Sequence, residues 1–405
     1  MNSGDAGGDA DESAKVERLD AELQAELADL EARSLLRRRR RVDGAQGPRI
    51  ELDGRGVLCL SSNNYLGLAD DPRLIEAAGA ALRTQGASGA SSPLISGHMA
   101  AHAELEDLAA AWLGTEAAII FGSGYHANIG TIGALTGPND AIFSDALNHA
   151  SLIDGARLSR ATVRIYRHRD VEHLDELLRA TPARRRLIVT DSIFSMDGDA
   201  APLDEIVELA EHHGAHVMID EAHAVGVFGD DGSGLANSLG LGARIAIRMG
   251  TLGKGLGSYG AFVAGSRSLI DVLVNRARAY VFSTALPPAV VAAATAAIGI
   301  ARAERERRAR LWANARALHG ALIAAGLRVE PLGSPIVPLI LGSAGRALAV
   351  SARMLEAGVF SPAIRPPTVP EGTARIRLTP LATHTPEEIA AAARVIIAAA
   401  REIAD

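Results

Sequence analysis

The chain has 405 residues, enough for two or three domains, and 48% of them are hydrophobic although only 3% are aromatic. Its formal net charge of −7 argues against nucleic acid or an anionic membrane surface as the main partner. Its single cysteine, Cys59, excludes an internal disulfide and is typical of the reducing cytoplasm, where we expect the protein to be located.

The N-terminal part of the chain divides into a tail and a helical segment. Residues 1–14 are acidic and rich in glycine, which predicts a disordered tail and is the opposite of a signal peptide. Residues 15–36 carry leucines at helical spacing and predict an amphipathic helix. Five arginines at 37–41 close this helix, where cations suit the helix dipole; binding a phosphate-rich ligand such as coenzyme A is the alternative. We expect 15–60 to form an N-terminal helix and strand segment.

The middle of the chain, from 61 to 295, alternates short strand-like runs with helical stretches. This pattern predicts a mainly parallel sheet with helices on both faces, in one large domain. The strand-like runs are 117–121, 141–143, 162–166, 186–190 and 216–220. An alanine-rich run at 289–301 is too short to cross a bilayer, so it predicts a buried helix. Residues 296–405 predict a smaller α+β C-terminal domain.

Chemically active residue types follow several of these strands. The segments are GSGYHAN (122–128), SDALNHAS (144–151), DSIFSMDGD (191–199), DEAHAVG (220–226) and GTLGKGLG (250–257). Ligands of parallel α/β sheets bind at the carboxyl ends of the strands. The convergence of these segments therefore predicts one ligand site at that edge of the sheet.

Lys254 is the most informative residue of these segments. The sequence has only one other lysine, Lys15, although lysine and arginine together number 41. A deprotonated lysine can attack a carbonyl, whereas arginine stays charged, so a lysine kept within a glycine-rich frame favours nucleophilic chemistry. Chance survival of two lysines is the alternative. A nucleotide-binding P-loop is excluded, because Arg248 and Gly255 stand where that motif needs Gly and Ser or Thr.

The DEAH segment is also found in a class of helicases, but that function needs the missing P-loop lysine and a basic surface. Asp220 ends a strand, where it either caps the next turn or holds the N–H of a pyridinium ring and keeps that ring electron-accepting. His223 could donate to a phenolic oxygen of the same ligand. The sequence HHGAH (212–216) predicts a helix C-cap at Gly214 rather than a metal site.

Three further features predict ligand contacts. The GSGYHAN segment opens a helix whose free N–H groups favour a phosphate, with the hydroxyl of Thr251 as a second anchor. His149 could stack on an aromatic ligand, although a capping role is the alternative. Arg365 stands beside two prolines that fix the backbone, which suits a guanidinium that binds a carboxylate; a surface loop is the alternative.

Six spaced motifs together resemble a known family. They are NNYLGLADDP, NHASLIDG, FSMDGD, DEAHAVGVFG, GTLGKGLG and FSTALPP. They are similar to those of the α-oxoamine synthases, fold-type I enzymes that use pyridoxal 5'-phosphate (PLP) to join an amino acid to an acyl-CoA with release of CO2. The resemblance runs from about residue 20 to the C-terminus. It implies an acyltransferase that is an obligate homodimer with shared active sites.

The resemblance also implies roles for individual residues. It makes Lys254 the lysine that binds PLP covalently, with Asp220 at the ring nitrogen, His223 near the phenolic oxygen and His149 stacked on the ring. The implied phosphate contacts are Gly124, Tyr125, Ser195 and Thr251, joined by Ser283 and Thr284 of the neighbouring subunit. The implied substrate contacts are Arg37, Asn63, His149, Arg365 and Thr368. No metal is expected.

Within the family, three motifs are most similar to the member that joins L-alanine to pimeloyl-CoA, or to pimeloyl-acyl carrier protein, in biotin biosynthesis. They are SLLRRRR, FSTALPP and AIRPPTVPEGTARIRLT. The alternatives are the member that joins glycine to acetyl-CoA and longer-chain relatives that use serine. Ser92-Pro93 departs from the pattern of many relatives, which leaves the local acyl-chain contact open.

Overall fold

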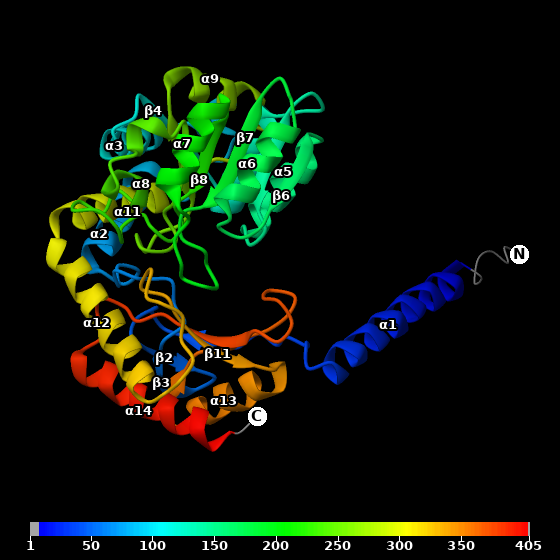
Figure 1. Ribbon diagram of the computed structural model, residues 1–405, viewed down its shortest axis with the longest axis vertical. Helices are drawn as coiled ribbons and strands as arrows, with labels where there is room; N and C mark the ends of the chain where they lie inside the picture. The colour runs from blue at the N-terminus through cyan, green and yellow to red at the C-terminus, as the bar shows by residue number, and fades with distance from the viewer. Residues whose placement is uncertain (1–7, 404–405) are drawn as a thin grey trace, which may run out of the picture.

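The computed structural model describes residues 8–403, without the side chains of 8–14, 16 and 17. In Figure 1 the body of the protein has two lobes, and α1 (Gly8–Ala32) projects away from both as a long helix. Residues 8–14 belong to this helix, whereas we expected them to be disordered. Extending an existing helix gains one hydrogen bond for each residue fixed. Residues 1–7 of the expected tail lie outside the described residues.

The upper lobe in Figure 1 is built on a seven-stranded sheet. The order of its strands is β4 (Ala117–Phe121), β10 (Ala261–Gly265), β9 (Ile247–Thr251), β8 (His216–Asp220), β7 (Arg186–Asp191), β5 (Ala141–Asp145) and β6 (Thr162–Tyr166). The strands from β9 to β6 are parallel, as predicted. β10 is antiparallel to both of its neighbours, which the sequence pattern did not predict.

Helices cover both faces of this sheet. The helices of the upper lobe are α2 (Pro72–Gln85), α3 (Ala100–Leu113), α4 (Gly124–Leu135), α5 (Ala150–Ser159), α6 (Val171–Ala180), α7 (Leu203–His213), α8 (Leu235–Ser238), α9 (Arg267–Arg276), α10 (Arg278–Val281) and α11 (Pro288–Ala303). Neighbouring residues of a strand belong to different apolar clusters: Ile119 lies in one and Ile120 in the other. This alternation places one apolar core on each face of the sheet.

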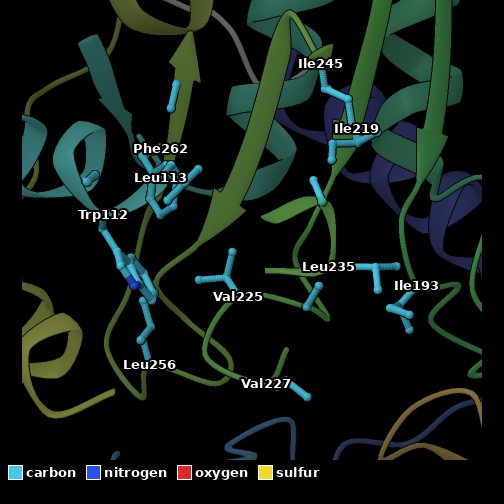
Figure 2. Packing of buried hydrophobic residues seen from close by; sticks show 14 of the residues in the cluster. Trp112, Leu113, Ile193, Ile219, Val225, Val227, Leu235, Ile245, Leu256 and Phe262 are labelled. Atoms are coloured by element: carbon cyan, nitrogen blue, oxygen red, sulfur yellow. The ribbon is translucent and has the colours of Figure 1, made fainter. Parts of the chain in front are cut away.

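One of these cores continues beyond the strand ends. Figure 2 shows Phe262 and Ile219 on their strands together with Val225 and Leu256 on the segments that follow strands. Leu256 is completely buried although it lies in the glycine-rich segment around Lys254. The core thus extends beneath the segments that carry Asp220 and Lys254, and it fixes their position.

Both ends of the chain contribute to the lower lobe. Its strands form two sheets. The first has the order β1 (Val42–Asp43), β2 (Arg49–Leu52), β3 (Arg55–Cys59) and β12 (Val359–Phe360), and the second has the order β11 (Val337–Gly342), β14 (Ala374–Leu378) and β13 (Ala363–Ile364). Its helices are α12 (Arg305–Ala324), α13 (Ala344–Glu356) and α14 (Pro386–Glu402). β12 pairs in parallel with β3, and Leu58 and Leu60 pack in one apolar cluster with C-terminal residues. The N-terminal strands therefore pack with the C-terminal part of the chain and not by themselves.

Two expectations about single segments are also met within the described residues. The alanine-rich run forms α11, which packs against α2 and α3, and no described helix is long and apolar enough to cross a membrane. Gly214 caps the C-terminus of α7 in the left-handed conformation at φ 60°, as predicted. Among the side chains that the structure describes, no group of three His, Cys, Asp or Glu could hold a metal ion.

Candidate active site

A cavity of about 150 Å³ lies at the carboxyl ends of β7, β8 and β9. Lys254, which follows β9, contributes its amine to this cavity, and Nζ lies 2.9 Å from Nε2 of His223. Burial lowers the pKa of Lys254 to about 8, and the guanidinium of Arg377 acts in the same direction while Asp220 opposes the shift. About a tenth of the amine is therefore neutral at pH 7, far more than for an exposed lysine, and a nucleophile or base requires this form.

The glycines around Lys254 allow the chain to pack closely there. Gly257 has a φ of 63°, and a Cβ atom on it would lie 2.5 Å from the backbone nitrogen of Ala69. A Cβ atom on Gly255 would lie 2.8 Å from the carbonyl oxygen of Val225. Both contacts are too close for a side chain, so the glycine frame is needed to bring Lys254 beside His223.

Asp220 is the last residue of β8 and lines the same cavity. The side-chain amide of Asn128 donates to its Oδ2 over 2.7 Å, and the backbone N–H of Ala222 donates to its Oδ1 over 2.8 Å. Asp220 thus caps the turn after the strand and also faces the cavity, so both of its predicted roles are sterically compatible. Asn128 was not singled out from the sequence, although it stands one helical turn after Gly124 on α4.

His149 caps α5 and lines the cavity at the same time. Its backbone N–H donates to Oδ2 of Asp191 over 2.7 Å, and its Nδ1 lies 2.7 Å from Oγ of Ser151. Burial lowers the pKa of His149, and the nearby amine of Lys254 adds to this while Asp220 opposes it. The imidazole is therefore uncharged at neutral pH, which suits contact with a flat aromatic ligand.

Asp191, which was not predicted as a site residue, is a second carboxyl group in the wall of the cavity. It ends β7, and burial together with the negative charge of Asp220 raises its pKa well above the usual value. Asp191 therefore ionises less readily than an exposed aspartate. The signal for Asp191 was its place at the start of the segment DSIFSMDGD, directly after a strand.

His223 connects the amine to the lower lobe through a chain of hydrogen bonds. Its Nδ1 lies 2.7 Å from the hydroxyl of Tyr65, which accepts a hydrogen bond from Nη2 of Arg377 over 3.0 Å. Burial lowers the pKa of His223 well below its usual value, and the charges of Lys254 and Arg377 lower it further. His223 is therefore neutral. Neither Tyr65 nor Arg377 was predicted as a site residue.

The N-terminus of α4 forms another part of the cavity wall. Gly124, Tyr125 and Thr251 line it, and Oγ of Ser123 accepts the N–H of His126 over 3.2 Å. The remaining first N–H groups of a helix have no partner within the helix and favour an anion. The hydroxyl of Tyr125 donates to Oδ2 of Asp154 over 2.6 Å.

The cavity fits a PLP-like molecule by its chemistry. Its wall offers an amine for an aldehyde, a carboxylate for a protonated ring nitrogen, a neutral imidazole and a helix N-terminus for a phosphate. Lys254, Asp220, His149 and Gly124 supply these groups.

The predicted residues of the lower lobe lie outside this cavity. Nη1 of Arg377 donates to Oδ1 of Asn63 over 3.0 Å, so Asn63 is connected to the residues around Lys254 through Arg377. Nη2 of Arg37 donates to Oγ1 of Thr368 over 3.1 Å. The guanidinium of Arg365 donates to the carbonyl oxygens of Ser34 and Leu36. Arg37, Arg365 and Thr368 thus gather near the end of α1.

Ser195 lines a second and larger hollow of about 870 Å³, which Leu30, Arg33 and Pro366 also line. The carbonyl oxygen of Ser195 accepts a hydrogen bond from Nε of Arg377, which also contacts Tyr65.

Ser283 and Thr284 line a different, small cavity of about 20 Å³. Pro93 lines it as well, so the departure at Ser92-Pro93 lies beside these two residues and apart from Lys254.

The sequence pattern of the aminotransferase class I and II family matches residues 55–396. The chain belongs to this family. It is 52% identical over 367 residues to 8-amino-7-oxononanoate synthase of Anaeromyxobacter dehalogenans (strain 2CP-1), covering 91% of this chain and 92% of the relative. It is 51% identical over 379 residues to 8-amino-7-oxononanoate synthase of Geobacter metallireducens, covering 92% of this chain and 96% of the relative.

Solved structures are similar to this chain over most of its length. A single-residue variant of serine palmitoyltransferase from S. paucimobilis, with PLP and myriocin bound, superposes with a TM-score of 0.90 at 35% identity and covers 96% of this chain and 98% of its own. 8-Amino-7-oxononanoate synthase from Francisella tularensis gives a TM-score of 0.74 at 27% identity, with coverage of 85% and 98%. These similarities confirm the resemblance to the α-oxoamine synthases and the fold-type I architecture.

Proposed function

We propose that the protein is a PLP-dependent acyltransferase of biotin biosynthesis. It condenses L-alanine with pimeloyl-CoA, or with pimeloyl-acyl carrier protein, and yields 8-amino-7-oxononanoate, CO2 and the free thiol of the carrier. The observation that carries the proposal is the amine of Lys254, which lies 2.9 Å from the neutral His223 in a cavity that Asp220 also lines. The names of relatives about half identical to this chain supply the product, and the family resemblance supplies the substrates.

Four groups of this chain would hold PLP. Lys254 would bind its aldehyde carbon, Asp220 its ring N–H, His149 its ring face, and the N-terminus of α4 with Thr251 its phosphate. When bound, PLP supplies an electron sink for the negative charge left at the α-carbon of an amino acid. Asn128 and the backbone N–H of Ala222 orient the carboxylate of Asp220, which therefore needs no rearrangement to receive a proton-bearing nitrogen.

Lys254 also moves the proton in this proposal. The neutral Nζ removes the α-proton of alanine and later returns a proton to the product. A pKa of about 8 suits both directions, because it lies close to the operating pH and both the amine and the ammonium forms are accessible. Nε2 of His223 lies within hydrogen-bond distance of Nζ and fixes the direction in which the amine points.

We propose that Arg377 faces the carboxylate of the amino acid. It is the guanidinium of the lower lobe that contacts Tyr65 and whose charge acts on Lys254 and His223. Arg365, to which the resemblance assigned this role, is directed at the carbonyl oxygens of Ser34 and Leu36. Arg365 with Arg37 and Thr368 is better placed to contact the acyl substrate beside the larger hollow, which Thr368 lines.

A homodimer with shared sites and a cytoplasmic location belong to the same proposal. Two observations support the dimer. The leucines of α1 form an exposed apolar stripe, with Leu19 56% and Leu27 50% exposed, on a helix that projects from the body in Figure 1. Ser283 and Thr284, the predicted phosphate contacts of a neighbouring subunit, lie outside the Lys254 cavity of their own chain.

The experiment that tests the function uses the purified protein loaded with PLP. Alanine or glycine is paired with pimeloyl-CoA or acetyl-CoA, and the product and CO2 are measured. We expect turnover with alanine and pimeloyl-CoA, and an absorbance band at the edge of the visible range that borohydride removes. Turnover of glycine with acetyl-CoA alone would instead identify a 2-amino-3-ketobutyrate CoA ligase. A protein without the absorbance band would overturn PLP chemistry altogether.

A further inference from the structure

His168 lies in the turn between β6 and α6, outside the cavity described above, and bridges two carboxylates. Its Nδ1 lies 2.9 Å from Oδ1 of Asp145, and its Nε2 lies 2.9 Å from Oδ2 of Asp199. Nη1 of Arg169 lies 3.1 Å from the same Oδ2. The charged groups that face His168 are therefore Asp145 at the end of β5, Asp199 in the segment after β7, and Arg169 in its own turn.

The two hydrogen bonds define the protonation state of His168. A neutral imidazole has one N–H and can donate to one carboxylate only, whereas an imidazolium donates to both. Burial lowers the pKa of His168, but the hydrogen bonds to Asp145 and Asp199 outweigh this and raise it to about 9. Burial raises the pKa of Asp199, but the contacts of this carboxylate with His168 and Arg169 outweigh burial and bring the pKa below its usual value. His168 is thus a cation held between two anions.

Asp145 connects His168 to the turn that presents His149. Its Oδ1 also accepts the backbone N–H of Leu147 over 2.8 Å, and its Oδ2 accepts the backbone N–H of Arg169 over 2.9 Å. The side chain of Asp145 is buried, so these bonds are shielded from water. The turn from 145 to 149 is therefore held at its start by Asp145 and at its end by the bond from His149 to Asp191.

Asp199 connects His168 to the segment 194–199, which we call the interlobe loop. The ring of His168 packs edge-on against Phe194 with 4.4 Å between ring centroids, and the N–H of Phe194 donates to the carbonyl oxygen of Asp199 over 3.0 Å. The same loop receives the lower lobe, because the carbonyl oxygen of Ser195 accepts from Arg377 and Met196 accepts from Arg375.

We propose that His168 is a positioning residue for the reaction: it fixes the turn that presents His149 relative to the interlobe loop that holds Arg377. The inference rests on the proposed function, since His149 and Arg377 contact PLP and the amino acid only in that function. His168 itself touches neither the Lys254 cavity nor the larger hollow that Ser195 lines. It acts through Asp145 and Asp199.

The test compares His168→Gln with the matched control His173→Gln in the PLP-loaded enzyme. His173 lies nearby in the first turn of α6. In the described structure its ring makes one hydrogen bond, in which Nδ1 accepts the backbone N–H of Arg167 over 3.0 Å. Amide hydrogen exchange of 146–149 and 194–199 is measured together with kcat and KM. In His168→Gln we expect faster exchange in both segments and a kcat lower by roughly 10-fold or more, because small misplacements cost rate steeply. His173→Gln should match the wild type.

Asp199→Asn is the second variant and separates the two halves of the bridge. It should accelerate exchange in 194–199 and leave 146–149 as in the wild type. The wild-type kcat should fall as pH rises through about 9, where His168 loses its proton, and His168→Gln should lack this limb.

The proposal is wrong if His168→Gln shows wild-type amide exchange in both segments and a wild-type kcat. It is also wrong if amide exchange in this variant is accelerated uniformly over the whole chain. If the wild-type protein forms no product but the variants show the expected exchange pattern, the proposed function is wrong, whereas the bridge between the two segments is supported.

Discussion

The guanidinium of Arg377 donates a hydrogen bond to the hydroxyl of Tyr65 over 3.0 Å, and this bond joins the lower lobe to the cluster around Lys254. Tyr65 is buried and passes the contact on to His223, 2.7 Å away. The positive charge of Arg377, which lies on β14 far along the chain, therefore acts on the amine of Lys254. A change at Arg377 should therefore affect both the pKa of Lys254 and the binding of the amino acid.

Arg377→Lys should lower kcat/KM for alanine by roughly 30-fold or more, because a lysine cannot reproduce the three directions in which this guanidinium donates. Arg365→Lys is the matched control from the same lobe and should chiefly change KM for the acyl substrate. Steady-state kinetics with each substrate varied in turn distinguish the two. Equal effects of both substitutions on alanine would contradict the assignment of Arg377.

Lys254→Arg should abolish turnover, with a loss of at least about 10³-fold, because the charge is kept while the reactive amine and the base are removed. Lys15→Arg, at the only other lysine of the sequence, is the control and should leave kcat unchanged. Activity and the absorbance band that borohydride removes are measured on both variants. An active Lys254→Arg enzyme would refute the proposed chemistry.

The two carboxyl groups of the cavity wall should respond differently to amide substitution. Asp220→Asn removes the negative charge opposite the ring nitrogen and should lower kcat by about 10²-fold or more. Asp191→Asn should cost clearly less, since burial and the charge of Asp220 raise the pKa of Asp191, so that an uncharged amide is a closer substitute at this position. Comparison of kcat for the two variants, with PLP content as the control, checks this order.

The pH dependence of kcat should reflect Lys254, whose amine is free to act as base only after alanine has taken its place on PLP. Burial lowers the pKa of this amine to about 8, so its neutral form increases as pH rises through that value. The kcat with alanine should therefore rise from about pH 7 toward about pH 8, and a profile that falls in this interval would contradict the role of the amine as base. Arg377→Lys keeps the charge but moves it, and should displace the limb.

His168 should make the free energy of unfolding depend on pH. Its folded pKa is about 9, above the unfolded value near 6.5, so its contribution is fully present below pH 6.5 and disappears as pH rises through 9. The difference between these two pKa values corresponds to about 3.4 kcal/mol as an upper bound, and screening by solvent at this partly exposed side chain reduces the contribution. Urea unfolding of the wild type and of His168→Gln at about pH 6 and about pH 10 should give a difference that shrinks at the higher pH.

The exposed leucines of α1 should matter for assembly. A double substitution of Leu23→Glu and Leu27→Glu places charges in the apolar stripe and should weaken the proposed dimer, whereas Ala25→Glu lies on the opposite face of the helix and should not. Light scattering of the eluting protein gives the mass. A stable dimer of the double variant would exclude α1 from the subunit contact.

The convergence of the central residues could be predicted because it depends on local rules. Asp220 ends a strand of a parallel sheet, Lys254 and His149 follow such strands, and the carboxyl ends of these strands meet at one edge. The glycine frame and the scarcity of lysine marked Lys254. The structure places these residues around a single cavity together with His223.

The remaining contacts depend on packing between distant segments, which sequence periodicity does not encode. Arg377 approaches from the lower lobe, and Asn128 faces Asp220 only because α4 packs against the strand ends. Asp191 is informative through its burial, which is a property of the folded state. The antiparallel β10 and the joining of β3 with β12 follow from long-range pairing for the same reason.

The pairing of β3 with β12 has a consequence for biosynthesis of the protein. A ribosome releases β2 and β3 early, yet the strand that completes their sheet emerges only near the end of translation. Until then Leu58 and Leu60 lack the apolar partners that bury them in the finished protein. The upper lobe can therefore fold first, while the N-terminal strands stay exposed to chaperones and proteases until the C-terminal strands have been made.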